Sequence, residues 1–86
     1  MTHLWIDGAN VTVTTLPDRD TWPGSFVWNG TLYSITSICN YWRVHADWWQ
    51  QEIRRDYFKV QTDVGLLCII YHDLIAGDWC LVKTYD

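Results

Sequence analysis

The longest unbroken apolar run of the chain is Leu66-Leu67-Cys68-Ile69-Ile70-Tyr71, and this stretch decides the fold class. A Gly precedes the run and Asp73 lies just beyond it, so turn residues bound it on both sides. Short apolar runs bounded in this way are typical of a buried central strand. The sequence therefore predicts a β domain built around this strand.

The segments on either side of the run also have strand patterns. Residues 57–62 alternate between apolar and polar side chains, and residues 79–85 carry β-branched and aromatic residues. Three strands in succession indicate an antiparallel meander. Gly65 and Gly77 are expected to be the left-handed residues of three-residue turns, because a two-residue turn would force a positive φ on a β-branched or bulky neighbour.

These turns set a register for the meander, with Thr62 opposite Leu66 and Leu74 opposite Asp78. Side chains alternate along a strand, so the register assigns each residue to a face. The predicted core face consists of Phe58, Val60, Cys68, Ile70, Cys80 and Val82, with Ile70 fully buried. The opposite face is predicted to consist of Tyr57, Lys59, Ile69, Tyr71, Leu81, Lys83 and Tyr85.

Upstream, Asn29-Gly30 is the strongest short-range hairpin signal, and we predict a positive φ at both residues, with Trp28 opposite Thr31. Residues 36–44 are expected to be extended, and residues 11–14 to offer an edge strand. Two prolines and a glycine predict a loop over residues 16–24, and residues 46–53 form at most one helical turn. The predicted fold is a strongly bent antiparallel sheet of five or six strands in a small open SH3-like barrel. A two-layer sheet with one short helix is the alternative.

The composition bounds the chain to one domain, residues 1–86, in which residues 23–86 form the β core and residues 1–22 an additional N-terminal strand and loop. Seven Trp, five Tyr and two Phe are more rings than a small core hides, which indicates an aromatic binding face. The net charge of −4 argues against nonspecific binding to duplex DNA. The N-terminus has no signal-peptide pattern, and no apolar run approaches about 20 residues, so we expect a cytoplasmic protein without a membrane span.

Three cysteines, Cys39, Cys68 and Cys80, occur without CxxC spacing. An odd number with no close pairs suits a reducing compartment, so we expect three free thiols, no intramolecular disulfide and no metal site. The glycines stand singly and form no phosphate-binding loop, so no cofactor is expected.

The predicted register also places Asp56 opposite His72, and His72 opposite Cys80. A Cys-His-Asp row is the arrangement of a nucleophilic enzyme. However, cross-strand neighbours start about 5 Å apart at Cβ, and nothing supplies an oxyanion hole. We therefore expect no catalytic residue, and a small enzyme that uses this Cys/His pair is only the third hypothesis.

Aromatic and basic residues are crowded between positions 42 and 55, and the candidate binding residues are Trp42, Arg43, Trp48, Trp49, Arg54 and Arg55. Trp and Arg dominate hot spots of protein interfaces, and the same residues suit a single-strand nucleic-acid groove. The alternative is a purely structural role, in which Trp42 and one of Trp48 or Trp49 close the open end of the barrel and Arg55 pairs with Asp56 or Glu52. We predict that Trp48 or Trp49 is exposed while Trp28 and Trp79 are mostly buried. A secondary candidate face consists of Tyr57, Tyr71 and Tyr85.

One family resemblance rests on the order of aromatic anchors, which are Phe26-Val27-Trp28-Asn29-Gly30-Thr31-Leu32-Tyr33, Trp42, Trp48-Trp49, Arg55, Tyr57-Phe58, Tyr71-His72-Asp73, Trp79 and Tyr85-Asp86. Over residues 23–86 the chain resembles a small bacterial domain of unknown function that occurs alone or appended to Y-family DNA-polymerase-like proteins of the damage-induced mutagenic repair cassette. The resemblance implies a context of translesion synthesis. It brings no catalytic residue with it.

The functional hypothesis is a non-catalytic interaction module, an accessory or docking domain in DNA-damage tolerance. Its expected partner is a polymerase-like or repair accessory protein. A weak single-stranded nucleic-acid-binding domain is the alternative, disfavoured by the net charge. The chain is expected to be a monomer or a weak homodimer, because an edge strand could pair two copies.

Overall fold

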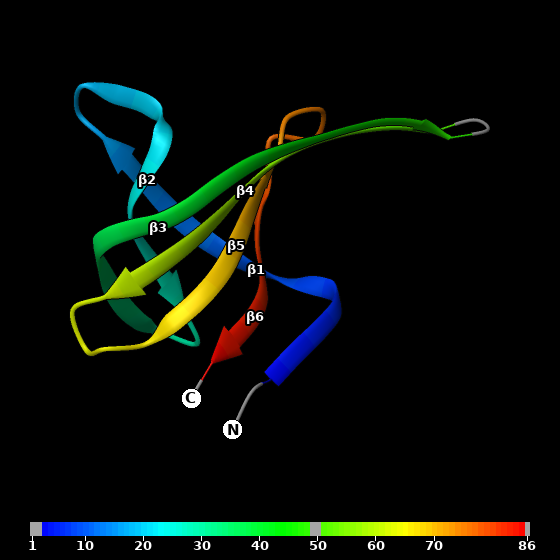
Figure 1. Cartoon of the computed structure of the whole chain (residues 1–86). Helices are drawn as coiled ribbons and strands as arrows, with labels where there is room; N and C mark the ends of the chain where they lie inside the picture. The colour runs from blue at the N-terminus through cyan, green and yellow to red at the C-terminus, as the bar shows by residue number, and fades with distance from the viewer. Residues whose placement is uncertain (1–2, 49–50, 86) are drawn as a thin grey trace.

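The computed structural model describes residues 3–48 and 51–85, which form six antiparallel strands in one closed barrel (Figure 1). The strands are β1 (His3–Leu16), β2 (Arg19–Trp28), β3 (Thr31–Trp48), β4 (Gln51–Thr62), β5 (Leu67–Asp73) and β6 (Trp79–Tyr85). The predicted mostly-β fold, a small barrel of the SH3-like type, is confirmed. The barrel is closed rather than open, because β1 pairs with both β2 and β6.

The hairpin turns follow the stereochemistry of their residues. Asn29 and Gly30 have φ values of 51° and 76°, and Trp28 lies opposite Thr31, as predicted. Gly65 has a φ of 82°, and the Thr62 N–H donates to the Leu66 carbonyl at 2.9 Å. The three-residue turn between β4 and β5 is therefore confirmed.

The N-terminal third differs from the prediction in two ways. The expected loop over residues 16–24 is mostly strand, since β1 ends at Leu16 and β2 begins at Arg19. Pro23 is buried and lies opposite Thr15, where the β1–β2 register shifts, because an irregular ladder tolerates the missing N–H of proline. The expected edge strand over residues 11–14 is an interior part of β1, in which Val11 pairs with β6 and residues 12–14 pair with β2.

The β5–β6 turn is one residue longer than predicted, with four residues between Asp73 and Asp78 instead of three between Leu74 and Asp78. The Asp73 N–H, rather than that of Leu74, donates to the Asp78 carbonyl at 2.8 Å. The Asp73 carboxylate accepts the N–H groups of Ile75 and Ala76, which stabilises this four-residue turn. The Leu74–Asp78 pairing was therefore wrong.

A bulge further along β6 compensates for the shift. Ile69 still lies opposite Lys83 as predicted, but Ile70 lies opposite Leu81, so Val82 is the extra residue. Leu81 consequently replaces Val82 in the core, where it is fully buried. Cys80 lies opposite Tyr71, on the other face of β6, although it is buried as expected. The faces predicted for these three β6 residues were wrong for this reason.

The core lies inside the barrel and consists of Phe26, Phe58, Val60, Cys68, Ile70 and Leu81. Ile70 is fully buried, as predicted. Phe58 packs edge-on against Trp22, with ring centroids 5.5 Å apart. Trp28 and Trp79 are partly buried and pack against this core. The described part of the chain has no helix of the length and apolarity needed to cross a membrane.

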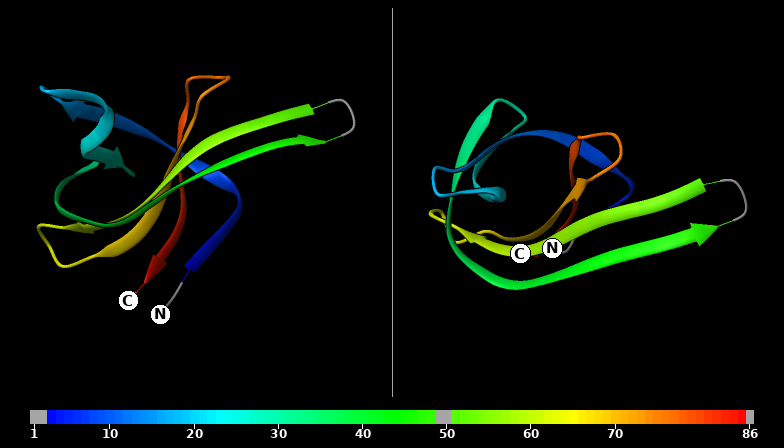
Figure 2. Two further views of the ribbon diagram at one scale, coloured as in Figure 1. Left: turned by 45° about the horizontal axis from the view of Figure 1, so that its top comes forward. Right: turned by 90° about the horizontal axis from the view of Figure 1, so that it is seen from above.

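The far halves of β3 and β4 leave the barrel as a two-stranded ribbon, seen in green in Figure 1 and in both views of Figure 2. We call residues 42–48 and 51–57 the arm. β5 pairs with β4 only from Arg55 onward, and the Arg54 carbonyl accepts the Leu74 N–H just beyond β5, so residues 51–53 pair with β3 alone. The single helical turn allowed for residues 46–53 is absent in the described residues, which continue the ladder to Trp48 opposite Gln51.

Candidate interaction surface

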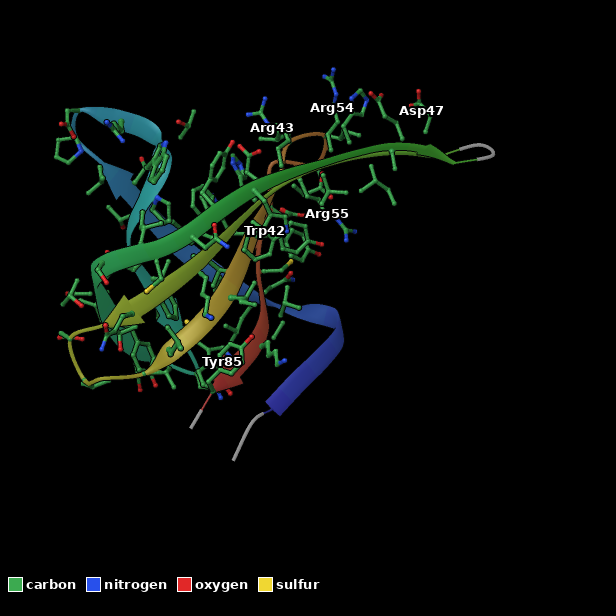
Figure 3. All side chains as sticks on the ribbon, in the orientation of Figure 1. Trp42, Arg43, Asp47, Arg54, Arg55 and Tyr85 are labelled. Carbon is green, nitrogen blue, oxygen red and sulfur yellow. The ribbon has the colours of Figure 1, made fainter. Side chains whose placement is uncertain are left out.

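The two faces of the arm divide the predicted Trp/Arg cluster. Trp42 lies opposite Tyr57, whereas Arg43 lies opposite Asp56. Since side chains alternate along strands, Trp42 and Arg55 belong to one face, and Arg43 and Arg54 to the other, as Figure 3 shows. The side chain of Trp48 and all of Trp49 lie outside the described residues, as does the prediction that one of them is exposed.

One face of the arm is charged, and its basic side chains are already paired. Arg43 holds the buried carboxylate of Asp56 with two bonds, Nε–Oδ1 at 2.6 Å and Nη2–Oδ2 at 3.1 Å. The hydrogen bond to Asp56 raises the pKa of Arg43. Arg54 contacts Glu52 at 3.1 Å. The expected alternative, in which Arg55 pairs with Asp56 or Glu52, is not what the structure has: these acids pair with Arg43 and Arg54.

The other face carries a row of stacked rings. The Trp42 and Tyr57 rings lie parallel within 6°, with centroids 5.4 Å apart, and the Tyr57 and Tyr71 centroids are 5.3 Å apart. The Arg55 guanidinium lies 4.5 Å from the centroid of the Tyr71 ring, and its Nη1 donates to the Tyr57 hydroxyl at 3.4 Å. The hydrogen bond to Tyr57 raises the pKa of Arg55. We call Trp42, Tyr57, Tyr71 and Arg55 the aromatic row. Tyr71 is only 7% exposed and forms the buried end of the row, beneath Arg55.

The aromatic row joins the primary and the secondary candidate sets that were predicted from the sequence. Trp42 and Arg55 came from the first set, and Tyr57 and Tyr71 from the second. The alternation of Trp42, Val44 and Ala46 with charged residues was the signal for this face. It was missed because the hairpin that brings β4 beside β3 was not recognised.

Tyr85, the third member of the secondary face, lies farther along the same outer surface of the barrel (Figure 3). The Nζ atoms of Lys59 and Lys83 lie 5.2 and 4.7 Å from the centroid of its ring. Arg55, Lys59 and Lys83, which are three of the six Lys and Arg residues, therefore lie over tyrosine rings on this surface. The surface is locally basic although the chain has a net charge of −4.

The predicted Cys-His-Asp row does not form. Asp56 lies opposite His72 as expected, but His72 lies opposite Trp79 and stacks on it, with centroids 4.3 Å apart and planes within 1°. Cys80 lies opposite Tyr71, on the other face of β6, and its Sγ donates to Asn10 Oδ1 at 3.4 Å. The bulge at Val82 separates the thiol from the imidazole, so the geometry of a nucleophile and its base is missing.

All three cysteines are free, and burial raises the pKa of Cys68 to about 12. Among the described residues, ligand atoms of three candidate metal-binding side chains converge at His45, Asp47 and Glu52. All three are exposed on the charged face of the arm, where Glu52 already contacts Arg54 and His45. This group has the composition of an ordinary solvated face.

The burial of His72 predicts a pH dependence of stability. Burial lowers the pKa of His72, and its Nδ1 has no hydrogen-bond partner in the described part of the chain. In the unfolded chain a histidine gains its proton near pH 6.5, so the stabilisation present above that pH is lost as the pH falls. We expect the Tm to fall between about pH 7.5 and about pH 5.

The control for this prediction is His72→Phe, which keeps a ring on Trp79 and has no titrating group. Its Tm should fall less over the same range, as measured by thermal unfolding. An equal fall in both proteins would assign the effect to other groups.

Comparison with known proteins finds one family. The model of the family described as Domain of unknown function (DUF6504) matches residues 6–86. The match begins within β1 and includes all the other strands, so the strand that closes the barrel is part of the family domain. No curated protein and no solved structure matches the chain. The chain therefore belongs to the DUF6504 family, a domain of unknown function.

Proposed function

We propose that this domain is a non-catalytic interaction module that docks on a protein partner through the aromatic row. The observation that carries the proposal is the stack of Trp42 on Tyr57 with Arg55 beside it, at the point where the arm joins the barrel. Trp, Tyr and Arg are the residues most enriched at binding hot spots. Because the rings are already stacked, binding immobilises few additional side-chain rotamers.

The cellular context of the proposal is DNA-damage tolerance in the cytoplasm, with a polymerase-like or repair accessory protein as the partner. Its support is the resemblance described above, carried by the order of the aromatic anchors. Several of these anchors, Trp42, Arg55, Tyr57 and Tyr71, make up the aromatic row.

A second candidate function is binding of single-stranded nucleic acid, favoured by one specific observation. Arg55, Lys59 and Lys83 each lie over a tyrosine ring on the same outer surface. Single-strand grooves combine rings that stack on bases with cations that meet phosphates. The overall negative charge opposes this function at long range.

Arg55→Ala and Arg54→Ala form a matched pair that tests the proposal, because adjacent arginines lie on opposite faces of the arm. We expect Arg55→Ala to abolish capture of replication or repair proteins by the immobilised domain from damaged cells of the source organism. Arg54→Ala should capture them normally. Both variants should unfold within about 1 kcal/mol of the wild type, since both side chains are solvent-accessible. Equal capture by the two variants would contradict docking through the aromatic row.

Salt dependence separates the two candidate functions. Binding to a fluorescent oligothymidylate of about 12 nucleotides would weaken steeply as salt rises, because bound cations are released. Docking on a protein through stacked rings should change little with salt. Tight, salt-sensitive oligothymidylate binding that Arg55→Ala removes would favour the nucleic-acid function instead.

A further inference from the structure

The outer edge of β3 is free over the arm. β2 pairs with β3 only between Thr31 and Ser34, and β4 occupies the opposite edge of β3. Beyond that point no strand of residues 3–48 or 51–85 pairs with this edge. Both views in Figure 2 show the arm leading away from the barrel. A long free edge is a template for pairing with another strand.

The backbone groups that point outward along this edge can be identified. The Leu74 N–H donates to the Arg54 carbonyl at 2.9 Å, so Arg54 directs its backbone groups toward β5. Successive residues direct these groups to alternate sides, so Arg55 directs its groups toward its partner in β3, Val44. The N–H and C=O of Arg43, His45 and Asp47 therefore point to the free edge.

The neighbouring edge position agrees with this assignment. The Tyr41 N–H also points outward by the same alternation, and it donates to the side-chain oxygen of Asn40 at 2.9 Å. The adjacent side chain thus caps one end of the edge. In the described part of the structure, the backbone groups of Arg43, His45 and Asp47 have no such cap.

The side chains along this edge are complementary in charge to the same edge of a second copy in the antiparallel direction. We propose that two copies of this chain pair edge to edge through β3, antiparallel, about a two-fold axis at His45. In this register Arg43 lies opposite Asp47 of the second copy, and Asp47 opposite Arg43. The outward backbone groups of His45 bond to those of His45 in the second copy. A two-fold axis makes each contact twice.

The charges of the single chain support this register. Asp47 lies directly opposite Glu52 within its own hairpin, and like charges at such a pair are destabilising. Glu52 is neutralised by contacts with Arg54 and His45, whereas no salt bridge to Asp47 is found among the described residues. Arg43 uses Nε and Nη2 on Asp56, which leaves Nη1 to contact a second carboxylate. The second copy supplies that pairing.

The opposite face of the arm is also complementary across the axis. In the same register Val44 lies opposite Ala46 of the second copy, next to Ile53 of its own hairpin. Small apolar side chains therefore meet on the face opposite the charged pair. Pairing uses the backbone edge of β3 and does not depend on the proposed function. It places Trp42 opposite Trp48 of the second copy, whereas Arg55, Tyr57 and Tyr71 lie away from the pairing edge.

Sedimentation equilibrium of the full chain, up to about 1 mM, tests the proposal against two variants. Asp47→Arg places a positive charge opposite Arg43 of the second copy at both symmetry-related contacts. It also removes the repulsion between Asp47 and Glu52 within each chain. It should raise the dimer Kd by about tenfold or more without lowering the Tm. His45→Pro removes the central N–H and should abolish the dimer, while His45→Ala keeps it. A wild-type chain that stays monomeric, or a dimer that both variants retain, would overturn the proposal.

Cross-linking tests the register itself. Val44 and Ala46 of the second copy form a non-hydrogen-bonded pair, whose Cα atoms lie about 4.5 Å apart, within disulfide range. With exposed Cys39 changed to Ser, mixed Val44→Cys and Ala46→Cys chains should form an oxidised heterodimer. Val44→Cys alone should not cross-link. The reverse pattern would exclude this register.

Discussion

Replacing Ile70 by Ala is expected to lower the free energy of unfolding by about 2–5 kcal/mol. Ile70 is fully buried at the centre of β5 and belongs to the core cluster. Ala at this position would lose the transfer free energy of three carbon atoms and leave a cavity that a closed barrel cannot collapse. A domain of this size usually has only about 5–15 kcal/mol in total, so the loss is a large share.

Ile69→Ala is the matched control, since it changes the same residue type one position earlier on the outer face. Ile69 is only partly buried, so this variant should lose about 1 kcal/mol or less. Urea unfolding of both variants measures the difference. Equal losses would contradict the assignment of Ile70 to the core face of β5 and of Ile69 to its outer face.

Gly8→Ala should produce the second large loss of stability. Gly8 has a φ of 78°, a conformation that costs an alanine about 1–2 kcal/mol. A Cβ at this position would also lie 2.9 Å from the Cβ of Cys80 and 3.3 Å from the Tyr71 ring. The β1–β6 register shifts between Leu4 and Ala9, so β1 has little freedom to move without losing its ladder.

Gly65→Ala separates the two causes. Gly65 has a similar φ of 82°, but nothing lies within 4 Å of the position of its Cβ. It should show the backbone cost alone, and Gly8→Ala should unfold at a lower urea concentration. If the two variants are equally stable, the close approach of Gly8 to Cys80 and Tyr71 adds nothing to the loss of stability.

Turns and strand type could be predicted from the sequence because they depend on neighbouring residues. Asn29 and Gly30 adopt positive φ in any hairpin that joins Trp28 to Thr31, and Gly65 does so before β5. The pairing of Asp56 with His72 followed correctly from the turn at Gly65. Residue pairs that are predicted by counting outward from a correctly assigned turn are correct up to the first bulge.

The candidate site could be predicted only as a set of residues. The residues of the aromatic row were named, but as parts of two separate groups. Their union required the β3–β4 pairing, which places Trp42 on Tyr57 and Arg43 on Asp56. The sequence between the paired residues Trp48 and Gln51 contains no Gly, Pro, Asn or Asp, so local sequence offered no signal for that pairing.

The sequence by itself determined the β class, the central strand around Ile70 and the hairpins at Asn29-Gly30 and Gly65, since these depend on side-chain alternation and on which residues tolerate a positive φ. Only the tertiary structure decided the bulge at Val82 and the closure of β1 on β6. The bulge moves Leu81 into the core and Cys80 away from His72. Closure pairs His3 with Thr84, positions at opposite ends of the chain. Both depend on how a twisted sheet packs its large side chains when it closes, and no local pattern encodes that packing.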